Sequence, residues 1–535
     1  MEILRRGEQG SMHRARQITP PPAAPGTVRS FADEFLAAAA RHPDKIAVTD
    51  ESGSLTWAEF AGLAARVARR LAEQGIGPGG FVGTLAENSA RHLAVYCGTL
   101  IAGACIAPLP TSANPATLRQ MRDNCGARLL FASPAFAETA AGLGAQVVPL
   151  AELDGWTAGA EPLDPVPVGG EDLFDLIYSS GTTGAPKGIE HDHLFRSRQF
   201  DRLLRWDMGP EAVTLVSTPL YSNTTLVAVL PTLVSGGSIV TMARFDCARF
   251  LELSQQHRVS HAMLVPVQYR RLMEHPGFDS YDLTSYRAKL STSAPLSADL
   301  IARVQARWPG NLVAFYGMTE GGVSCVLDCD ADPGKWDTAG RPAPGCDVRV
   351  IDDSGAELPP GVPGEVVARN GSMMAGYHLA PEKTAEVVWR SPEGLDFIRT
   401  GDIGRIDPDG YVRLSDRKKD MILTGGFNVY ASDLEAVLMQ HPEVSDAAVI
   451  AVPSADWGET PLALVVPRGG ARASAEALRD WANARLGKVQ RISAVEFRDS
   501  LPRSDIGKVL KRELRAPYWP AAGEADRAQP ERTGG

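Results

Sequence analysis

The sequence is poor in the features that mark secreted and metal-bound proteins. It holds seven cysteines in 535 residues, an odd number with no C-x-x-C pair, so we expect a reduced, cytoplasmic setting and no disulfide framework. Cys325 and Cys329 lie close together, but no second pair or histidine cluster accompanies them, which argues against a zinc site. The first 27 residues contain no apolar run of the kind that a signal peptide needs.

A membrane span is also not expected. The one long uncharged run, residues 212–243, contains Pro219, Pro231 and the Gly236–Gly237 pair, which should interrupt a helix. Hydroxyl and amide side chains at residues 222–225 interrupt its apolar character. We therefore interpret the run as buried strands and helices of an α/β core.

The chain has no excess of positive charge. It carries 54 Lys and Arg against 64 Asp and Glu, a net charge of −10, so we expect no nucleic-acid partner. A local cluster of cations can still bind a small anionic substrate. Apolar residues make up 44% of the sequence, which is ample for a large core.

Short apolar strands alternate with helical patterns from about Val28 to Pro333, which predicts parallel α/β layers. Between Gly340 and Asp420, short strands with Gly, Pro and Asp turns predict β-hairpins, and a compact α+β unit follows. The expected fold class is α/β, with a large N-terminal domain of layered α/β subdomains plus a β-rich subdomain, and a small α+β C-terminal domain. The expected segments are a disordered lead-in at 1–27, the large domain at 28–418, the small domain at 419–515 and a tail at 516–535.

The stretch YSSGTTGAPKG, Tyr178 to Gly188, has the composition of a phosphate-binding loop without the spacing of a P-loop. A P-loop has lysine directly after its second glycine, whereas here Ala185 and Pro186 intervene. Glycines permit close backbone approach, hydroxyl groups and amides suit an anion, and Lys187 adds a point charge. The alternative is an exposed flexible loop. The residues expected to hold phosphate are Ser179, Ser180, Gly181, Thr182, Thr183, Gly184 and Lys187.

Three further sequence motifs contain charged or hydroxyl side chains that could bind parts of a nucleotide. FYGMTEGG, residues 315–322, offers Thr319 to a phosphate oxygen and Glu320 to a hard cation. The string from RTGD to SDRKKD contains Asp402, whose carboxylate can accept both hydroxyls of a ribose, and Arg417. LPRSDIGKVLKREL contains Lys508 before a helical pattern. Each residue alone is readily explained as a solvated charge or a turn.

In their order, these strings resemble the motifs of the adenylate-forming superfamily, which includes acyl-CoA synthetases, peptide-synthetase adenylation domains and beetle luciferases. The resemblance runs from about residue 30 to 515. It implies that Thr319 contacts the α-phosphate of ATP and that Glu320 binds Mg²⁺ with help from Thr183. It also implies that Asp402 and Arg417 hold the ribose. The residues that it places around the adenine are Ser293, Ala294, Pro295, Tyr316, Gly317 and Met318.

The resemblance also implies two half-reactions. Lys508, the third catalytic residue beside Thr319 and Glu320, would stabilise attack of a carboxylate on the α-phosphate, giving an acyl-adenylate and pyrophosphate. The small domain, mobile about a hinge at Lys419, would then withdraw Lys508. Gly425 and Gly426 match the loop that lines the pantetheine tunnel for coenzyme A, although a plain turn is the other interpretation.

Free coenzyme A is the expected acceptor because no carrier-protein pattern appears in the chain. Two alternatives stay open: loading of a carrier-protein phosphopantetheine, and a non-catalytic nucleotide-binding protein. A homodimer is left open as well. The expected cofactors are ATP, Mg²⁺ and coenzyme A.

The expected substrate is a hydrophobic monocarboxylic acid. The stretch PLYSNTTLVAVLP offers no acidic side chain for an amine, which disfavours amino acids. Many aryl and acyl ligases of the superfamily have histidine where Ser222 stands, which puts benzoate-type acids in doubt. Wall candidates, which are equally explained as core residues, are Tyr221, Ser222, Val227, Val265 and Met318.

Two histidines follow the phosphate loop in GIEHDH, with acidic residues beside them. The resemblance aligns His193 with the histidine that usually follows this loop, and His191 with a more variable position. We therefore do not expect a metal site there.

Overall fold

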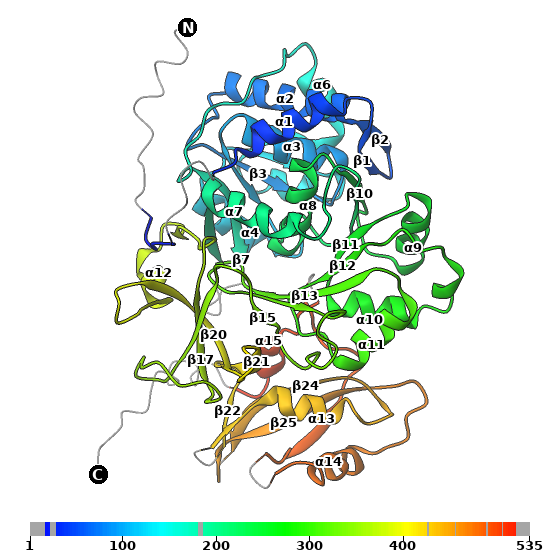
Figure 1. Cartoon of the computed structure of the whole chain (residues 1–535), viewed down its shortest axis with the longest axis vertical. Coiled ribbons are helices and arrows are strands. Elements are labelled where there is room, and N and C mark those ends of the chain that lie inside the picture. The colour runs from blue at the N-terminus through cyan, green and yellow to red at the C-terminus, as the bar shows by residue number, and fades with distance from the viewer. Residues whose placement is uncertain are drawn as a thin grey trace. The chain divides into compact units, whose positions relative to one another are not determined.

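The computed structural model describes residues 16–21, 28–179, 186–424, 427–454, 456–487, 490–504 and 507–519 (Figure 1). The chain divides into two compact units by its internal contacts. The first comprises Met1–Arg349, Val367–Thr400 and Gly410–Val412, and the second comprises Val350–Val366, Gly401–Asp409 and Arg413–Gly535. The expected segment boundaries at residues 27, 418 and 515 stay predictions.

A nine-stranded sheet forms part of the first unit. Its central strands are parallel, and the outer pairs β13–β14, β14–β15 and β1–β2 are antiparallel. The strands are, in sheet order, β15 (Arg341–Pro342), β14 (Ser324–Asp328), β13 (Asn311–Gly317), β12 (Ala288–Ser291), β11 (His261–Leu264), β9 (Val213–Val216), β10 (Ser238–Thr241), β1 (Ile46–Asp50) and β2 (Gly53–Thr56). Every residue of β10, β11 and β12 is buried, as parallel strands covered on both faces require.

A seven-stranded sheet lies in the same unit. Strands β6, β5, β3, β4 and β7 are parallel, and β8 and β18 continue the sheet in antiparallel fashion. The strands are, in sheet order, β18 (Gly376–Tyr377), β8 (Lys187–Asp192), β7 (Leu173–Ser179), β4 (Cys105–Pro108), β3 (Phe81–Leu85), β5 (Leu129–Ala132) and β6 (Gln146–Pro149). The expectation of an α/β fold with parallel strands is thus confirmed.

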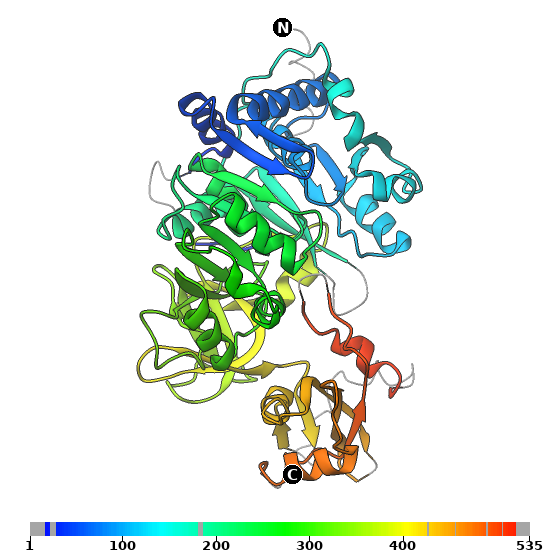
Figure 2. The same ribbon diagram turned by 90° about the vertical axis from the view of Figure 1, so that its right-hand side faces the viewer.

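Amphipathic helices pack on these sheets, and helix α2 shows why. Thr56 and Glu59 form a reciprocal capping box at its start, and Trp57, Phe60 and Val67 repeat at helical spacing on its buried side. Helices α1, α2 and α3 lie side by side (Figures 1 and 2). The helices of this unit are α1 (Phe31–Arg41), α2 (Trp57–Glu73), α3 (Ala90–Ile101), α4 (Pro115–Cys125), α5 (Ala137–Ala141), α6 (Leu153–Thr157), α7 (His193–Leu204), α8 (Asn223–Val234), α9 (Cys247–Gln256), α10 (Pro266–Glu274), α11 (Ala298–Arg307) and α12 (Pro381–Glu386).

The β-hairpin texture predicted for residues 340–420 corresponds to a five-stranded sheet. Its order is β16 (Asp347–Ile351), β17 (Gly364–Arg369), β20 (Asp396–Ile406) and β19 (Val388–Arg390), and β21 (Val412–Arg417) pairs with β20. Strands β20 and β21 carry Asp402 and Arg417, so this sheet positions two of the predicted nucleotide-binding residues.

The C-terminal part of the second unit has a sheet with helices packed on it (Figure 2, orange). The sheet contains β23 (Phe427–Val429), β22 (Ile422–Thr424), β25 (Gly458–Pro467), β24 (Val444–Ser454) and β26 (Ala494–Phe497). Alternate residues of β24 enter two different clusters: Val449 packs with Leu434 and Leu438, whereas Ile450 packs with Leu514. The helices are α13 (Ala431–Leu438), α14 (Ala475–Asn483) and α15 (Lys511–Arg515).

The uncharged run at residues 212–243 folds as β9, α8 and β10, which confirms the interpretation as buried α/β core. One detail was wrong: Pro231 lies inside α8 and does not interrupt it. The helix accepts the loss of one backbone hydrogen bond because buried side chains hold it on nearly every side. Among the residues that the structure describes, no helix is both long and apolar enough to cross a membrane.

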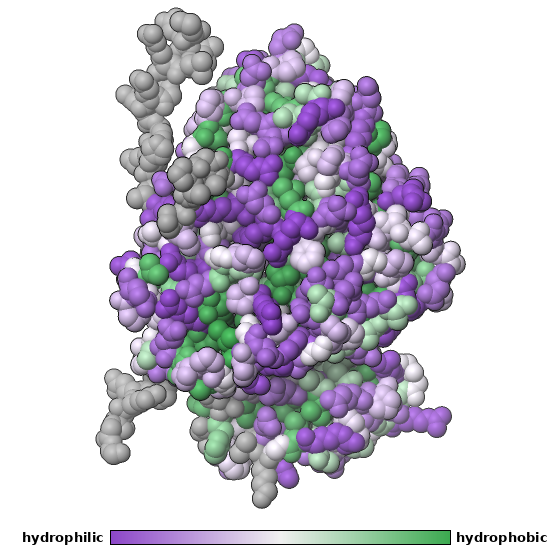
Figure 3. All heavy atoms as spheres, in the orientation of Figure 1, coloured by the Kyte–Doolittle hydropathy of each residue, from purple (hydrophilic) through white to green (hydrophobic). Residues whose placement is uncertain are grey.

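The face drawn in Figure 3 is mostly polar, with apolar residues in small groups.

Candidate active site

The expected phosphate loop connects β7 to β8. Its two ends are neighbours, because Ser179 pairs with Lys187 in the antiparallel ladder. Ser180, Gly181, Thr182, Thr183 and Gly184 lie outside the described residues. The ammonium group of Lys187 lies 4.8 Å from the centre of the Tyr377 ring, on the neighbouring strand β18.

Tyr377 also contacts the carboxylate that was predicted to bind Mg²⁺. Its hydroxyl donates to Oε1 of Glu320 over 2.8 Å. Burial, reinforced by the charge of Glu320, raises the pKa of Tyr377 well above its usual value, so the hydroxyl stays a donor. Lys187 and Glu320 therefore share one neighbour. Tyr377 was missed in the sequence because no motif marks it.

The turn after β13 holds Thr319 and Glu320 against residues 372–374. The carbonyl of Glu320 accepts from the Met374 amide over 2.9 Å, and the Gly322 amide donates to the carbonyl of Ser372 over 2.9 Å. Gly321 has φ +73°, and a Cβ there would lie 2.0 Å from the Ser372 carbonyl oxygen. The glycines of TEGG are thus needed for this close approach.

The two histidines after the loop take different places. His193 is buried at the start of α7, edge-on to Phe174, and burial lowers its pKa to about 4. His191 is fully buried on β8, and its Nε2 donates to the Thr319 carbonyl over 2.7 Å. In the described part of the chain, no group of three or more possible metal ligands occurs.

The segment expected beside the adenine meets the start of α8. Ser293 has φ +77°, rare for a residue with a side chain, and its hydroxyl bonds that of Thr224 over 2.6 Å. Ala294 and Pro295 are exposed, and Tyr316 and Gly317 end strand β13.

The predicted acid-pocket residues are not gathered into one described pocket. Ser222 caps α8 by accepting from the Thr224 amide, and Tyr221 precedes it. Val227 packs beside Met208 and Met263, and Met318 packs in a different cluster beside Ile189 and Met373. Val265 is 1% exposed at the start of α10. These assignments therefore stay predictions.

In the second unit, the structure places the two predicted ribose residues in contact. Nε of Arg417, at the end of β21, lies 2.7 Å from Oδ1 of Asp402 on β20. The amide of the next residue, Lys418, donates to the Gly401 carbonyl over 2.8 Å, which fixes the chain just before the predicted hinge residue Lys419. Gly425 and Gly426 lie outside the described residues.

Lys508 belongs to the same charged group. Burial, followed by the positive charges of Arg417 and Lys419, lowers the pKa of Lys508 to about 8, and Asp402 and Asp420 oppose this shift. The Ser504 amide donates to the carbonyl of Lys508 over 2.8 Å. Within the described residues, its ammonium group makes no hydrogen bond or ion pair. Three cations thus gather beside Asp402, which suits a phosphate-bearing ligand.

Glu320 has the chemistry of a Mg²⁺ ligand. Only Tyr377 among the described residues donates to its side chain, so a carboxylate oxygen is left for an ion. Because Mg²⁺ is usually held by one or two carboxylates together with substrate phosphates, a single carboxylate that shares the neighbour Tyr377 with Lys187 fits this ion.

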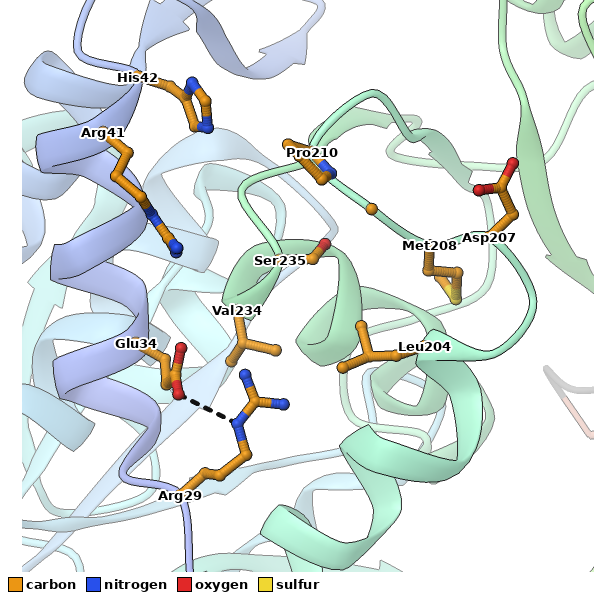
Figure 4. Close-up of a pocket in the computed structure, with 11 residues that line it drawn as sticks. Arg29, Glu34, Arg41, His42, Leu204, Asp207, Met208, Pro210, Val234 and Ser235 are labelled. Atoms are coloured by element: carbon orange, nitrogen blue, oxygen red, sulfur yellow. Dashed lines mark hydrogen bonds and ion pairs between the residues drawn. The ribbon is translucent and has the colours of Figure 1, made fainter.

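A separate surface pocket of about 380 Å³ lies in the first unit (Figure 4). Arg29 and Glu34, which form a 3.0 Å ion pair, line it from the start of the chain, opposite Val234 and Ser235. It contains none of the predicted site residues.

Comparisons with known proteins agree with the motifs. The chain matches the AMP-binding enzyme family over residues 35–378 and the AMP-binding enzyme C-terminal domain over residues 433–508. It is 38% identical to feruloyl-CoA synthase of Amycolatopsis sp over 88% of this chain and 96% of that protein. It is 32% identical to 4-coumarate–CoA ligase-like 9 of Oryza sativa subsp. japonica, over 95% and 96%. ATP-bound MatB from Rhodopseudomonas palustris superposes with a TM-score of 0.81 at 32% identity, over 91% of this chain and 99% of that one. The chain therefore belongs to the AMP-binding enzyme family, in its acyl-CoA synthetase branch.

Proposed function

We propose that this protein joins a carboxylic acid to coenzyme A in two steps, with ATP as the energy source. In the first step a carboxylate oxygen attacks the α-phosphorus of ATP, and the bond to the bridging oxygen of pyrophosphate breaks. In the second step the coenzyme A thiol loses its proton and attacks the acyl carbon, and AMP leaves. The observation that carries the proposal is the contact of Tyr377 with both Lys187 and Glu320, and the ion pair of Asp402 with Arg417 supports the ribose end of the nucleotide.

The first step brings two anions together, and cations lower the cost of this approach. Lys508 is suited to the task, because its ammonium group has no described anionic partner of its own in this structure. Thr319 offers a hydroxyl to the α-phosphate, and Lys187 offers charge to the departing pyrophosphate. Bound Mg²⁺ supplies charge neutralisation at the phosphates.

Asp402 suits the sugar end of the nucleotide. A carboxylate only accepts hydrogen bonds, so it can take both hydroxyls of a ribose. The ion pair with Arg417 orients the carboxylate. Asp402, Arg417 and Lys508 all belong to the second unit, so the proposed ribose contact and the proposed catalytic lysine lie in one compact part of the chain.

The second step is proposed to use free coenzyme A. The curated relatives named above are CoA synthases or ligases, which supports this acceptor. Gly425 and Gly426 are retained as the proposed lining of the pantetheine path, on the resemblance alone.

The proposed acid is hydrophobic and aromatic. The first relative is named for feruloyl-CoA and the second for 4-coumarate, so hydroxycinnamic acids are the first candidates. The stretch from Tyr221 to Asn223 has no acidic side chain to hold an amine, which supports an uncharged acid tail. Tyr221, Ser222, Val227, Val265 and Met318 are proposed to line its pocket.

A cytoplasmic setting is part of the proposal, and it is supported by seven cysteines that are all free thiols. Whether the chain forms a homodimer is left to a measurement of its mass in solution.

The test is acid-dependent pyrophosphate release from ATP across ferulate, 4-coumarate, fatty acids and amino acids, with thioester formation followed in parallel. We expect release with hydroxycinnamates and a CoA thioester as product. Loading of a carrier protein without loading of coenzyme A would reassign the acceptor. Absence of release with every acid would leave a non-catalytic nucleotide-binding protein.

A further inference from the structure

Four buried polar side chains form a cluster inside the first unit, apart from the residues predicted from the motifs. They are Tyr96 on α3, Asp175 on β7, His191 on β8 and Arg196 on α7, and each is at most 1% exposed.

Asp175 is the centre of this cluster. Its Oδ2 accepts from Nε of Arg196 over 2.9 Å and from the Tyr96 hydroxyl over 2.7 Å, and its Oδ1 lies 2.7 Å from Nδ1 of His191. Burial by itself raises the pKa of Asp175, but the charge of Arg196 and the contact with His191 outweigh it, so the net shift is downward. Burying such charges costs desolvation free energy that apolar side chains of similar volume do not incur. Stability alone is therefore a weak reason for the cluster.

The two ends of the cluster contact different parts of the proposed active site. At one end, Nε2 of His191 donates to the backbone carbonyl of Thr319 over 2.7 Å. At the other end, Nη1 of Arg196 donates to Oδ1 of Asn223 over 2.7 Å. Asn223 is the first residue of α8 and follows the proposed acid-pocket residues Tyr221 and Ser222.

We propose that His191 is a positioning residue for adenylation: through the Thr319 carbonyl it fixes the Thr319 hydroxyl and the Glu320 carboxylate relative to the acid bound at the start of α8. Asp175 and Arg196 hold the imidazole from behind and connect it to Asn223. This inference rests on the proposed function, because it assigns Thr319 and Glu320 to the phosphates and α8 to the acid.

Adenylation needs such a positioning residue because its reacting atoms tolerate little displacement. A carboxylate oxygen must meet the α-phosphorus in line, and a displacement of about 1 Å costs roughly 10²-fold in rate. In the turn at Thr319, Glu320 and Gly322 are held by backbone hydrogen bonds to residues 372–374, and the buried hydrogen bond from His191 on β8 restrains Thr319 itself.

The test compares two substitutions of His191 in the full chain. His191→Met removes the donor to Thr319 at similar volume, and His191→Gln retains an N–H near the position of Nε2. The control is Tyr286→Phe, which removes another buried hydrogen bond, to the Ser254 hydroxyl on α9, outside the cluster. Acid-dependent ATP–pyrophosphate exchange, thioester formation from supplied acyl-AMP, and melting temperature are measured for each.

We expect His191→Met to lower kcat of exchange by roughly 10–100-fold with a smaller effect on the transfer step, and His191→Gln to recover most of the loss. Tyr286→Phe should lower the melting temperature without changing either half-reaction. The inference is overturned if His191→Met exchanges as fast as the wild type, or if both half-reactions fall in proportion to the loss of stability.

A second substitution keeps the test open should His191→Met not fold. Asn223→Ala removes the acceptor at the other end of the cluster, and we expect it to raise KM for the acid more than it lowers kcat. Unchanged kinetics in Asn223→Ala would overturn the connection to α8. Failure of the wild type to exchange pyrophosphate with any acid would instead overturn the proposed function, and the positioning role with it.

Discussion

The hydroxyl of Tyr377 donates to Oε1 of Glu320 over 2.8 Å, while the ring of the same tyrosine lies 4.8 Å from the ammonium group of Lys187. One side chain thus contacts both the proposed metal ligand and the proposed phosphate-binding lysine. Because Lys187 and Glu320 are far apart in sequence, this shared contact is the strongest geometric support for a common triphosphate site.

We expect Tyr377→Phe to slow adenylation, because it removes the hydroxyl that donates to Glu320 and orients its carboxylate. A hydrogen bond to a charged group contributes about 1.5–3 kcal/mol, so we expect kcat/KM for MgATP to fall by roughly 10-fold or more. The Mg²⁺ concentration needed for half-maximal exchange should rise. Tyr411→Phe is the matched control, because Tyr411 donates to Oδ1 of Asp332, a carboxylate outside the proposed site. Equal effects of the two substitutions would contradict the role of Tyr377.

Lys508→Ala should separate the two half-reactions. Loss of one oriented charge-stabilising group typically costs about 10²-fold or more, so adenylation should fall by at least that factor. Formation of thioester from supplied acyl-AMP and coenzyme A should be affected far less, because that step forms no bond to phosphorus. The check is pyrophosphate exchange beside single-turnover transfer. A similar loss of rate in both half-reactions would contradict the proposal that Lys508 serves adenylation and is withdrawn before transfer.

The pH dependence of adenylation should report Lys508. Its pKa is lowered to about 8, so the ammonium form that stabilises phosphate prevails below that pH and is lost as the pH rises through it. We expect kcat/KM of the first step, which reports the free enzyme, to fall above about pH 8 with the loss of one proton. Lys508→Arg keeps its charge over this range and should remove the fall. A profile that is the same in the wild type and in Lys508→Arg would assign the titration to another group.

Asp402→Asn tests the ribose contact. The substitution preserves shape but removes the charge that Arg417 pairs with, and we expect KM for ATP to rise by roughly 10–100-fold. The wild type should discriminate strongly between ATP and 2′,3′-dideoxy-ATP, and the variant weakly, since the acceptor for the hydroxyls is impaired. Undiminished discrimination in the variant would place the ribose elsewhere.

Local sequence patterns were enough to predict many of the strands and helices. The sequence patterns at residues 173–180, 431–440 and 444–452 predict a strand, a helix and a strand, and the structure has β7, α13 and β24 at these places. Each is an apolar or amphipathic segment bounded by turn residues, so its local preference and its final environment agree. Pro231 was misjudged because tertiary packing outweighed a local penalty.

Contacts between residues that are far apart in the chain could not be predicted from the sequence. Strong motifs identified Glu320 and Thr319, but their partners Tyr377 and His191 belong to segments with no distinctive spacing. The register of the resemblance placed His191 at a variable position, and nothing in the sequence of the strand KGIEHD shows that its polar side chains are buried and need partners. The gathering of Asp402, Arg417 and Lys508 was expected only from the resemblance to a family.

The central claim is that a carboxylate oxygen attacks the phosphorus nearest the sugar. It is tested most directly with ferulate, or the best acid found by screening, labelled with ¹⁸O in its carboxylate. After thioester formation, we predict AMP that carries one ¹⁸O per turnover and pyrophosphate that carries none. Label in phosphate or pyrophosphate, or ADP as the nucleotide product, would contradict the account.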